Sequence, residues 1–366
     1  MKLKHLIIVT LLVCLPAAWA FGGDNPWPKP QVSVFATGLN NPRGLTFGPD
    51  KALYVAEGGT GGTETTTPAD CEQVPAPIGP YSGGFTASIA RINRHGEVRR
   101  IVTGLASSQT SMQSGGLISG VADVAFIDRR LYAITAGAGC SHGLKNTFNK
   151  VIRVKRNSSW HVVANLSAFL KSHPVAHPEE EDFEPDGTWY SMLALDDKLY
   201  AVEPNHGELD RISPRTGKVS RVVDISKSQG HIVPTVMTSV LRDVLLISNL
   251  NTFPITPGSS SLFAATRGGF FVKLTSGFTT VLGLAVRDGK VYVLEMSNAP
   301  GMPTPGKGDI VTIDLFGRKD TIVTGLDLPT AMTFGPDGDL YVSNKGFGFP
   351  AGSGEILRIS LSSHEH

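Results

Sequence analysis

The sequence lacks several features that mark common functional classes. Its formal net charge is only +1, so no overall electrostatic field favours nucleic acid or a membrane surface. After residue 20, no apolar run reaches the ~20 residues that a membrane span requires. It contains no phosphate-binding glycine loop, no Ser-His-Asp order and no locally spaced zinc ligands. These absences argue against nucleotide-dependent, nucleic-acid-binding and transmembrane functions.

The first twenty residues have the pattern of a secretory signal peptide. Two lysines open the chain, an apolar run follows from Leu6 to Ala18, and Ala18-Trp19-Ala20 is a small-x-small cleavage signal. A lipoprotein signal would use Cys14, but the residue before it is not small. We therefore expect a signal peptide at 1–20, a short extension at 21–30, and a secreted or periplasmic mature protein.

Only three cysteines are present, and one of them leaves with the signal peptide. The remaining pair, Cys71 and Cys140, is an even number in an oxidising compartment, which favours a disulfide over two free buried thiols. Both lie in loops expected to be neighbours, between the second and third strands of successive units.

The chain repeats one short unit. Residues 38–57 read GLNNPRGLTFGPDKALYVAE, and residues 325–344 read GLDLPTAMTFGPDGDLYVSN. Each contains an apolar strand, a tight turn and a strand beginning Leu-Tyr. Weaker copies occur at 121–135, 191–203, 235–249 and 282–295. Six copies at this spacing, rich in glycine and proline, are typical of a propeller.

Two further strands follow most copies, which gives four strands per unit. Examples of the third strand are 87–92, 150–154 and 355–359. Residues 33–39 look like a fourth strand but come first, whereas the last unit lacks its fourth. The sequence therefore predicts an all-β, six-bladed β-propeller over 31–360, with a tail at 361–366. The N-terminal strand would complete the C-terminal blade and close the ring.

The long connections all fall on one face of this propeller. Turns between first and second strands, and between third and fourth strands, are short, whereas the other connections are long. Loops on a rigid scaffold commonly carry function, so we expect the function on the long-loop face.

The second strands of the blades end on that face, at equivalent polar positions. These residues are Glu57, Thr135, Glu203, Asn249, Glu295 and Asn344. If the carboxylates converge at the channel mouth, they would repel each other unless they bind a cation or accept hydrogen bonds from nearby donors. Carboxylate and amide oxygens suit Ca²⁺, which makes Glu57, Glu203, Asn249, Glu295 and Asn344 candidate metal ligands. The alternative is a polar ring hydrogen-bonded to waters or to backbone N–H groups, with Arg43 or Lys345 supplying charge.

The same loops contain candidate catalytic and ligand-binding residues. His206 lies three residues from Glu203 and could act as a general base, and His231 is a further candidate. Structural roles for these histidines remain open. Trp189 and Tyr190 could floor a pocket or belong to the core. The expected ligand contacts are Arg43, Trp189, Tyr190, Asn205 and His142.

Several segments resemble proteins of the ScyD/ScyE family. The resemblance is carried by GLNNPRGLTFGPDKALYVAEGGTGG, CEQVPAPIGPYSGGFTASIARI, DFEPDGTWYSMLAL, YAVEPNHGELDRI and SQGHIVPT, and it extends over about 31–360. It implies a six-bladed, TolB-like propeller with a signal peptide, and it implies no particular chemistry. Looser likenesses exist to calcium-dependent gluconolactonase-type propellers and to quinoprotein sugar dehydrogenases, which share the GLxxPxGLxF opening.

Two classes of function remain open at this point. The favoured one is binding of a small molecule or protein partner on the long-loop face by a monomer that binds neither nucleic acid nor membrane. The alternative is a Ca²⁺-dependent lactone or ester hydrolase, in which a loop carboxylate or His206 activates water. A quinoprotein-like dehydrogenase is a weaker third possibility, because no matching His-Arg pair is found.

Overall fold

The structure is a computed structural model that describes residues 30–178 and 183–361. The predicted signal peptide at 1–20 and nearly all of the 21–30 extension lie outside the described residues, as does most of the tail.

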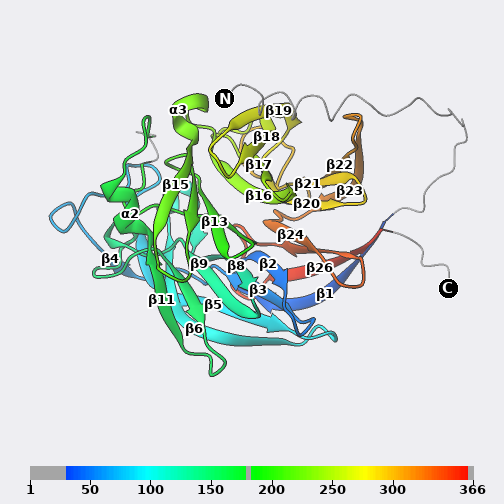
Figure 1. Ribbon diagram of the computed structural model, residues 1–366. Helices are drawn as coiled ribbons and strands as arrows, with labels where there is room; N and C mark the ends of the chain where they lie inside the picture. Colours follow the sequence, from blue (N-terminus) through cyan, green and yellow to red (C-terminus); the bar gives the residue numbers. More distant parts are fainter. Residues whose placement is uncertain (1–29, 179–182, 362–366) are drawn as a thin grey trace, which may run out of the picture.

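The described chain folds into six antiparallel sheets arranged as the blades of a propeller, which confirms the predicted fold class (Figure 1). Each blade runs outward from its first strand to its fourth. The first three blades are β2 (Pro42–Phe47), β3 (Leu53–Glu57), β5 (Ser82–Ile92), β6 (Val98–Gln109); β8 (Val121–Ile127), β9 (Arg130–Thr135), β10 (Lys150–Val154), β11 (Trp160–Asn165); and β12 (Ser191–Leu195), β13 (Lys198–Glu203), β14 (Glu208–Ile212), β15 (Val219–Asp224). The last three are β16 (Pro234–Leu241), β17 (Val244–Asn249), β18 (Ser260–Thr266), β19 (Phe271–Phe278); β20 (Val281–Arg287), β21 (Lys290–Glu295), β22 (Gly308–Ile313), β23 (Lys319–Leu326); and β24 (Ala331–Phe334), β25 (Leu340–Asn344), β26 (Gly354–Ser360), β1 (Gln31–Leu39).

The ring closes as predicted. Strand β1 pairs antiparallel with β26, with Ser33 opposite Arg358 and Thr37 opposite Glu355. The last blade therefore combines the two ends of the described chain, and its fourth strand comes from the N-terminal side.

The hydrophobic core lies between neighbouring blades. One cluster joins the second and third blades through Ile134, Trp189 and Leu199, and another joins the sixth and first through Leu39 and Leu53. Burial of both sheet faces explains why the second strands read as nearly continuous apolar runs such as LYVA and LYAIT.

The short turns use left-handed backbone conformations. Lys51 adopts φ +61° at the position corresponding to Gly338, which has φ +90°. A lysine can adopt this conformation at a modest cost, so the loss of the expected glycine leaves the hairpin intact.

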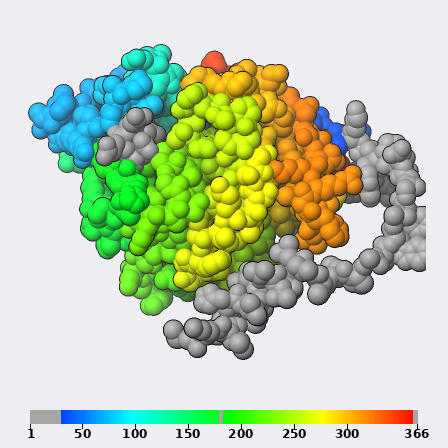
Figure 2. All heavy atoms as spheres, turned by 90° about the horizontal axis from the view of Figure 1, so that it is seen from above, coloured from blue at the N-terminus to red at the C-terminus, as the bar shows by residue number. Residues whose placement is uncertain are grey.

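The long connections contain short elements that the sequence analysis treated as loops. These are β4 (Glu64–Thr65), β7 (Ile118–Ser119), the 3₁₀ turns η1 (Met112–Ser114) and η2 (Cys140–His142), and the helices α2 (Leu166–Ser172) and α3 (Ile225–Gln229). Asn165 and Asp224 cap the two α-helices through their side chains. The light-blue segment after β3 projects from the edge of the molecule beside green segments (Figure 2).

Candidate functional site

The polar residues that end the second strands bind the backbone around them. Four of them accept a hydrogen bond from an N–H group just before their blade's first strand. These bonds join Asn40 N to Glu57 Oε1 (2.8 Å), Thr188 N to Glu203 Oε1 (2.7 Å), Thr279 N to Glu295 Oε1 (2.8 Å) and Asp327 N to Asn344 Oδ1 (3.0 Å). Asn249 donates to the Ile232 carbonyl (2.9 Å), and Thr135 accepts from Lys150 N (3.0 Å). The residues thus occupy equivalent positions, but each one binds backbone groups of its own blade or of the segment that leads into it.

The carboxylates of this ring also have separate local environments. Glu57 receives Ser88 Oγ (2.6 Å) and two nitrogens of Arg100 (2.7 and 2.9 Å). Burial tends to raise the pKa of Glu203, but His206 outweighs it and the pKa is lowered. Burial raises the pKa of Glu295 to about 7, and the charge of Lys319 offsets this increase only in part.

The three ring carboxylates therefore do not converge on a common centre. Among the described residues, no group of three or more Asp, Glu, His or Cys side chains could hold a metal ion. Neither Arg43 nor Lys345 forms an ion pair with the ring carboxylates among the described residues. Arg43 binds the Ile118 carbonyl, and Lys345 pairs with Glu355 at 3.2 Å. The expected convergence is absent because equivalent strand positions fix only how far along the channel axis a side chain lies. The backbone N–H beside each oxygen decides which way the oxygen turns.

The loops of the first three blades meet in a buried polar network. Glu184 accepts from Tyr81 Oη (2.6 Å) and from the Thr188 hydroxyl, and its Oε2 lies 3.3 Å from His142 Nε2. The Tyr81 ring stacks on His142, and Ser108 Oγ lies 2.9 Å from His142 Nδ1. Burial lowers the pKa of His142 to about 4 and raises that of Glu184 to about 7. The His142 imidazole is accordingly uncharged at neutral pH, so its contact with Glu184 is not an ion pair.

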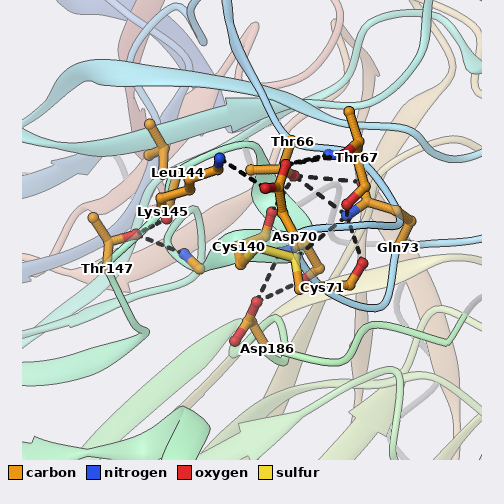
Figure 3. The surroundings of a disulfide bond; sticks show 12 residues. Thr66, Thr67, Asp70, Cys71, Gln73, Cys140, Leu144, Lys145, Thr147 and Asp186 are labelled. Carbon is orange, nitrogen blue, oxygen red and sulfur yellow. Dashed lines mark hydrogen bonds and ion pairs between the residues drawn. A yellow bond between two sulfur atoms is a disulfide. The ribbon is translucent and has the colours of Figure 1, made fainter.

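The predicted disulfide lies beside this network and is confirmed (Figure 3). Cys71 and Cys140 are bonded at an S–S distance of 2.02 Å, across a separation of 69 residues. Thr66 Oγ1 donates to the Cys140 carbonyl (2.6 Å), and Lys145 pairs with Asp70 at 2.8 Å. These contacts join the long loops of the first and second blades.

Two of the predicted ligand contacts, Trp189 and His142, have fully buried side chains in the structure. Trp189 is 0% exposed within the core between the second and third blades, and its indole N–H points to Asp210 Oδ2 at 3.4 Å. His142 is also 0% exposed, inside the polar network. Both side chains pack inside the protein.

The predicted catalytic pair is close together but enclosed. His206 Nδ1 lies 3.2 Å from Glu203 Oε2, and the imidazole rests edge-on against Phe183. The His206 and Glu203 side chains are 5% and 0% exposed, and Asn205 beside them is also buried. His231 is half-buried in the segment between α3 and β16. Neither His206 nor Glu203 lines the central cavity described next.

The central channel contains a cavity of about 360 Å³. The first strands of all six blades, β2, β8, β12, β16, β20 and β24, line it, and Figure 1 shows most of them around the centre of the ring. Asp123 is the charged residue in this lining. Its oxygens accept from Val124 N (2.8 Å) and, across the blade boundary, from Met192 N (2.7 Å). Burial raises the pKa of Asp123 to about 7.

A β-bulge occurs at the start of the first strand in four blades. The register skips at Pro42/Leu45, Val121/Asp123, Pro234/Val236 and Val281/Gly283. Bulges re-aim side chains and are common beside functional sites. Gly44 lies in the first of these bulges, and a Cβ there would come within 1.9 Å of Asp123 Oδ1. Glycine at position 44 therefore makes room for the carboxyl group of Asp123.

The mouth of the channel on the long-loop face is amphipathic. Arg43 donates hydrogen bonds to the Ile118 carbonyl and to Tyr190, whose hydroxyl donates to the Thr330 carbonyl (3.1 Å). The guanidinium carbon lies 5.9 Å from the centre of the Phe347 ring. Burial raises the pKa of Tyr190 to about 12, so its hydroxyl keeps its proton. Arg43 and Tyr190, both predicted ligand contacts, are thus brought together.

An apolar cluster faces this polar group. Three of its side chains, Leu282, Met296 and Leu328, are buried. Four others pack on them and stay partly accessible, namely Tyr190, Leu250, Phe347 and Phe349. Most of these side chains come from loops and first strands of the last three blades. We call this cluster, together with Arg43, the mouth site.

Sequence reasoning did not identify Asp123, Leu250, Phe347 or Phe349 at this site. A signal existed for Asp123, because it is a carboxylate inside an otherwise apolar first strand, VADVAFI. The others follow the second strands in loops of no recognisable pattern, and only the closed ring brings them together.

Comparisons with known proteins support the fold. No protein-family model matches the chain, and no curated protein sequence matches it. Among solved structures, a putative glucose dehydrogenase from Thermus thermophilus superposes with a TM-score of 0.55 at 16% identity, covering 90% of this chain and 99% of that one. A gluconolactonase from Xanthomonas campestris gives 0.54 at 10% identity, covering 94% and 98%. The PQQ-bound aldose sugar dehydrogenase from Streptomyces coelicolor gives 0.53 at 15%, covering 91% and 98%. Likenesses at such low identity establish the propeller architecture alone.

Within residues 30–178 and 183–361, no helix is both long and apolar enough to cross a membrane.

Proposed function

We propose that this protein is an extracytoplasmic propeller that binds a small, largely apolar molecule at the mouth site. The observation that carries the proposal is the amphipathic wall at the end of a cavity of about 360 Å³. Small-molecule sites are typically concave and mostly apolar, with a few polar groups that fix orientation. In this chain, Arg43, Tyr190 and Asp123 supply those polar groups.

The proposal refines the expectation of ligand binding on the long-loop face. It narrows the expected site on that face to Arg43, Tyr190, the first strands and the apolar loops around Phe347. The signal-peptide pattern and the resemblance to ScyD/ScyE proteins support an extracytoplasmic location and membership of that group, which we include in the proposal.

The test is binding of the neutral fluorescent probe N-phenyl-1-naphthylamine, whose emission rises in apolar surroundings. The mature protein should bind one equivalent, and Phe347→Ala should weaken binding because it removes part of the apolar wall. Phe316→Ala is the matched control, since Phe316 is 89% exposed in the short turn between β22 and β23. Absence of saturable binding, or equal loss in the two variants, would reject the proposal.

A second candidate function is hydrolysis of a lactone or aryl ester. It is favoured by Asp123, a carboxyl group on the channel wall whose pKa of about 7 suits a general acid or base at neutral pH. The residues first considered as calcium ligands do not fit a metal site, so this candidate depends on Asp123 alone. A hydrolysis screen of wild type and Asp123→Asn, with and without chelator, tests it. Activity that survives in Asp123→Asn would exclude this role.

A further inference from the structure

Arg43 is the most deeply buried arginine of the described chain, at 8% exposure. Its hydrogen-bond partners are both uncharged, the Ile118 carbonyl and the Tyr190 hydroxyl. Within the described residues, no carboxylate lies within ion-pair distance of it. The positive charge at the channel mouth is therefore hydrogen-bonded but not neutralised.

Other arginines of the chain that are more exposed than Arg43 do have carboxylate partners. These pairs are Arg100 with Glu57, Arg221 with Glu208, Arg267 with Asp196, and Arg358 with Asp339. Removing a guanidinium from water without a counter-charge is costly, because the lost hydration is only partly replaced by neutral groups. Arg43 is thus a buried cation that has no carboxylate partner among the described residues.

The position of Arg43 suggests where such an anion would come from. The guanidinium lies over the edge of the apolar cluster, 5.9 Å from the Phe347 ring centre. Its planar fork of N–H donors matches a carboxylate or sulfonate. A molecule lying against Phe347 could therefore place an acidic group at Arg43 without leaving the apolar wall.

We infer that the ligand of the mouth site is an apolar, ring-containing acid whose single anionic group pairs with Arg43. This inference rests on the proposed binding function and specifies its ligand class. It disfavours a sugar or sugar lactone, because several hydroxyl groups would need as many side-chain partners. The wall formed by Leu250, Leu282, Met296, Leu328, Phe347 and Phe349 supplies none.

Two probes with the same carbon skeleton test the inference. N-Phenyl-1-naphthylamine is neutral, and 8-anilino-1-naphthalenesulfonate is the same molecule with a sulfonate. Wild-type mature protein should bind the sulfonate roughly ten-fold or more tightly than the neutral probe, because a charge-assisted pair forms only with the former. Titration calorimetry should give one site for each probe.

Variants of Arg43 separate charge from packing. Arg43→Gln should lower the affinity for the sulfonate much more than the affinity for the neutral probe, so that the preference between the two probes disappears. Arg43→Lys should keep part of the preference, and Phe347→Ala should weaken both probes. Arg318→Gln is the control, because Arg318 is exposed in the short turn before β23 and should change nothing. Thermal melting of each variant identifies any loss caused by unfolding, in which case Arg43→Lys carries the test.

The possible outcomes distinguish the two proposals. Equal wild-type affinity for both probes, or a preference that persists unchanged in Arg43→Gln, would overturn the acid inference and leave apolar binding intact. Displacement of the neutral probe by gluconolactone but not by 2-naphthoate would point to a sugar-type ligand and also overturn it. Absence of binding by either probe would reject the proposed function itself.

Discussion

Replacement of Glu57 by alanine should destabilise the propeller without any involvement of calcium. The Glu57 carboxylate is fully buried between the first and sixth blades, where it accepts from Asn40 N, Ser88 Oγ and the Arg100 guanidinium. A buried donor left without an acceptor costs about 1–3 kcal/mol, and breaking a buried ion pair costs about 3–5 kcal/mol. The Arg100 side chain is 35% exposed and can be rehydrated, so the lower end applies. We expect a loss of about 3 kcal/mol in the free energy of unfolding.

Urea unfolding of the mature protein measures this loss, with either excess Ca²⁺ or EDTA in the buffer. The difference between wild type and Glu57→Ala should be the same in both buffers, since the partners of Glu57 are protein groups. Glu72→Ala is the control, because Glu72 is exposed in the loop before β5 and should change stability little. Our account of the ring would be refuted by a Ca²⁺-dependent stabilisation of wild type that disappears in Glu57→Ala. A loss no larger than that of Glu72→Ala would also refute it.

Three further predictions concern the disulfide and two carboxyl groups. The double change Cys71→Ser and Cys140→Ser should lower unfolding free energy by about 4 kcal/mol, the loop-closure value for 69 residues, and an unchanged urea midpoint would contradict this. Binding of the anionic naphthalene probe should weaken as pH rises through about 7, where Asp123 ionises beside Tyr190 and adds repulsion; the neutral probe and Asp123→Asn should show no such dependence in fluorescence titrations. Folded Glu295 keeps its proton up to a pKa of about 7, against 4.5 for the ordinary carboxyl, so its contribution favours folding below 4.5 and is lost as pH rises to 7. Glu295→Gln should therefore gain stability relative to wild type between those pH values, and urea midpoints that shift in parallel would disprove it.

The propeller could be predicted from the sequence because its information is local and repeated. Each LYVAE-like strand and its short turn occupies about fifteen residues, and six copies leave few alternatives to a ring. The closure by β1 followed from an extra strand before the first unit and a missing fourth strand in the last unit. The disulfide followed from the same register, which placed Cys71 and Cys140 in neighbouring loops.

The site was harder to predict because it depends on directions that strand alignment does not contain. Glu57 and Glu203 were placed correctly along their strands, but an N–H group of the preceding segment turns each carboxylate away from a shared centre. Trp189 resembled a pocket floor, whereas the neighbouring blade buries it completely. Tyr190, one residue further and just before β12, lines the channel instead.

The bulges explain why the first strands, and not the second, carry the candidate site. A second strand is paired on both sides, so backbone N–H groups lie close to its last polar residue. The side chain accepts a hydrogen bond from one of them and holds the neighbouring segment in place. A first strand is paired on one side only, and its other edge borders the channel. In four blades, an extra residue at this edge breaks the ladder just where the channel opens.

In the bulge of the first blade, Arg43 and Gly44 stand opposite the single residue Ala56, and in the second blade Ala122, just before Asp123, is the extra residue. Without the bulge, Asp123 would follow the regular alternation of its strand, and Gly44 would not be needed beside it. The irregular residues of the repeat are thus those that bring charge to the channel. In a ring of six similar blades, the chemistry specific to this protein is concentrated where the repeat is broken.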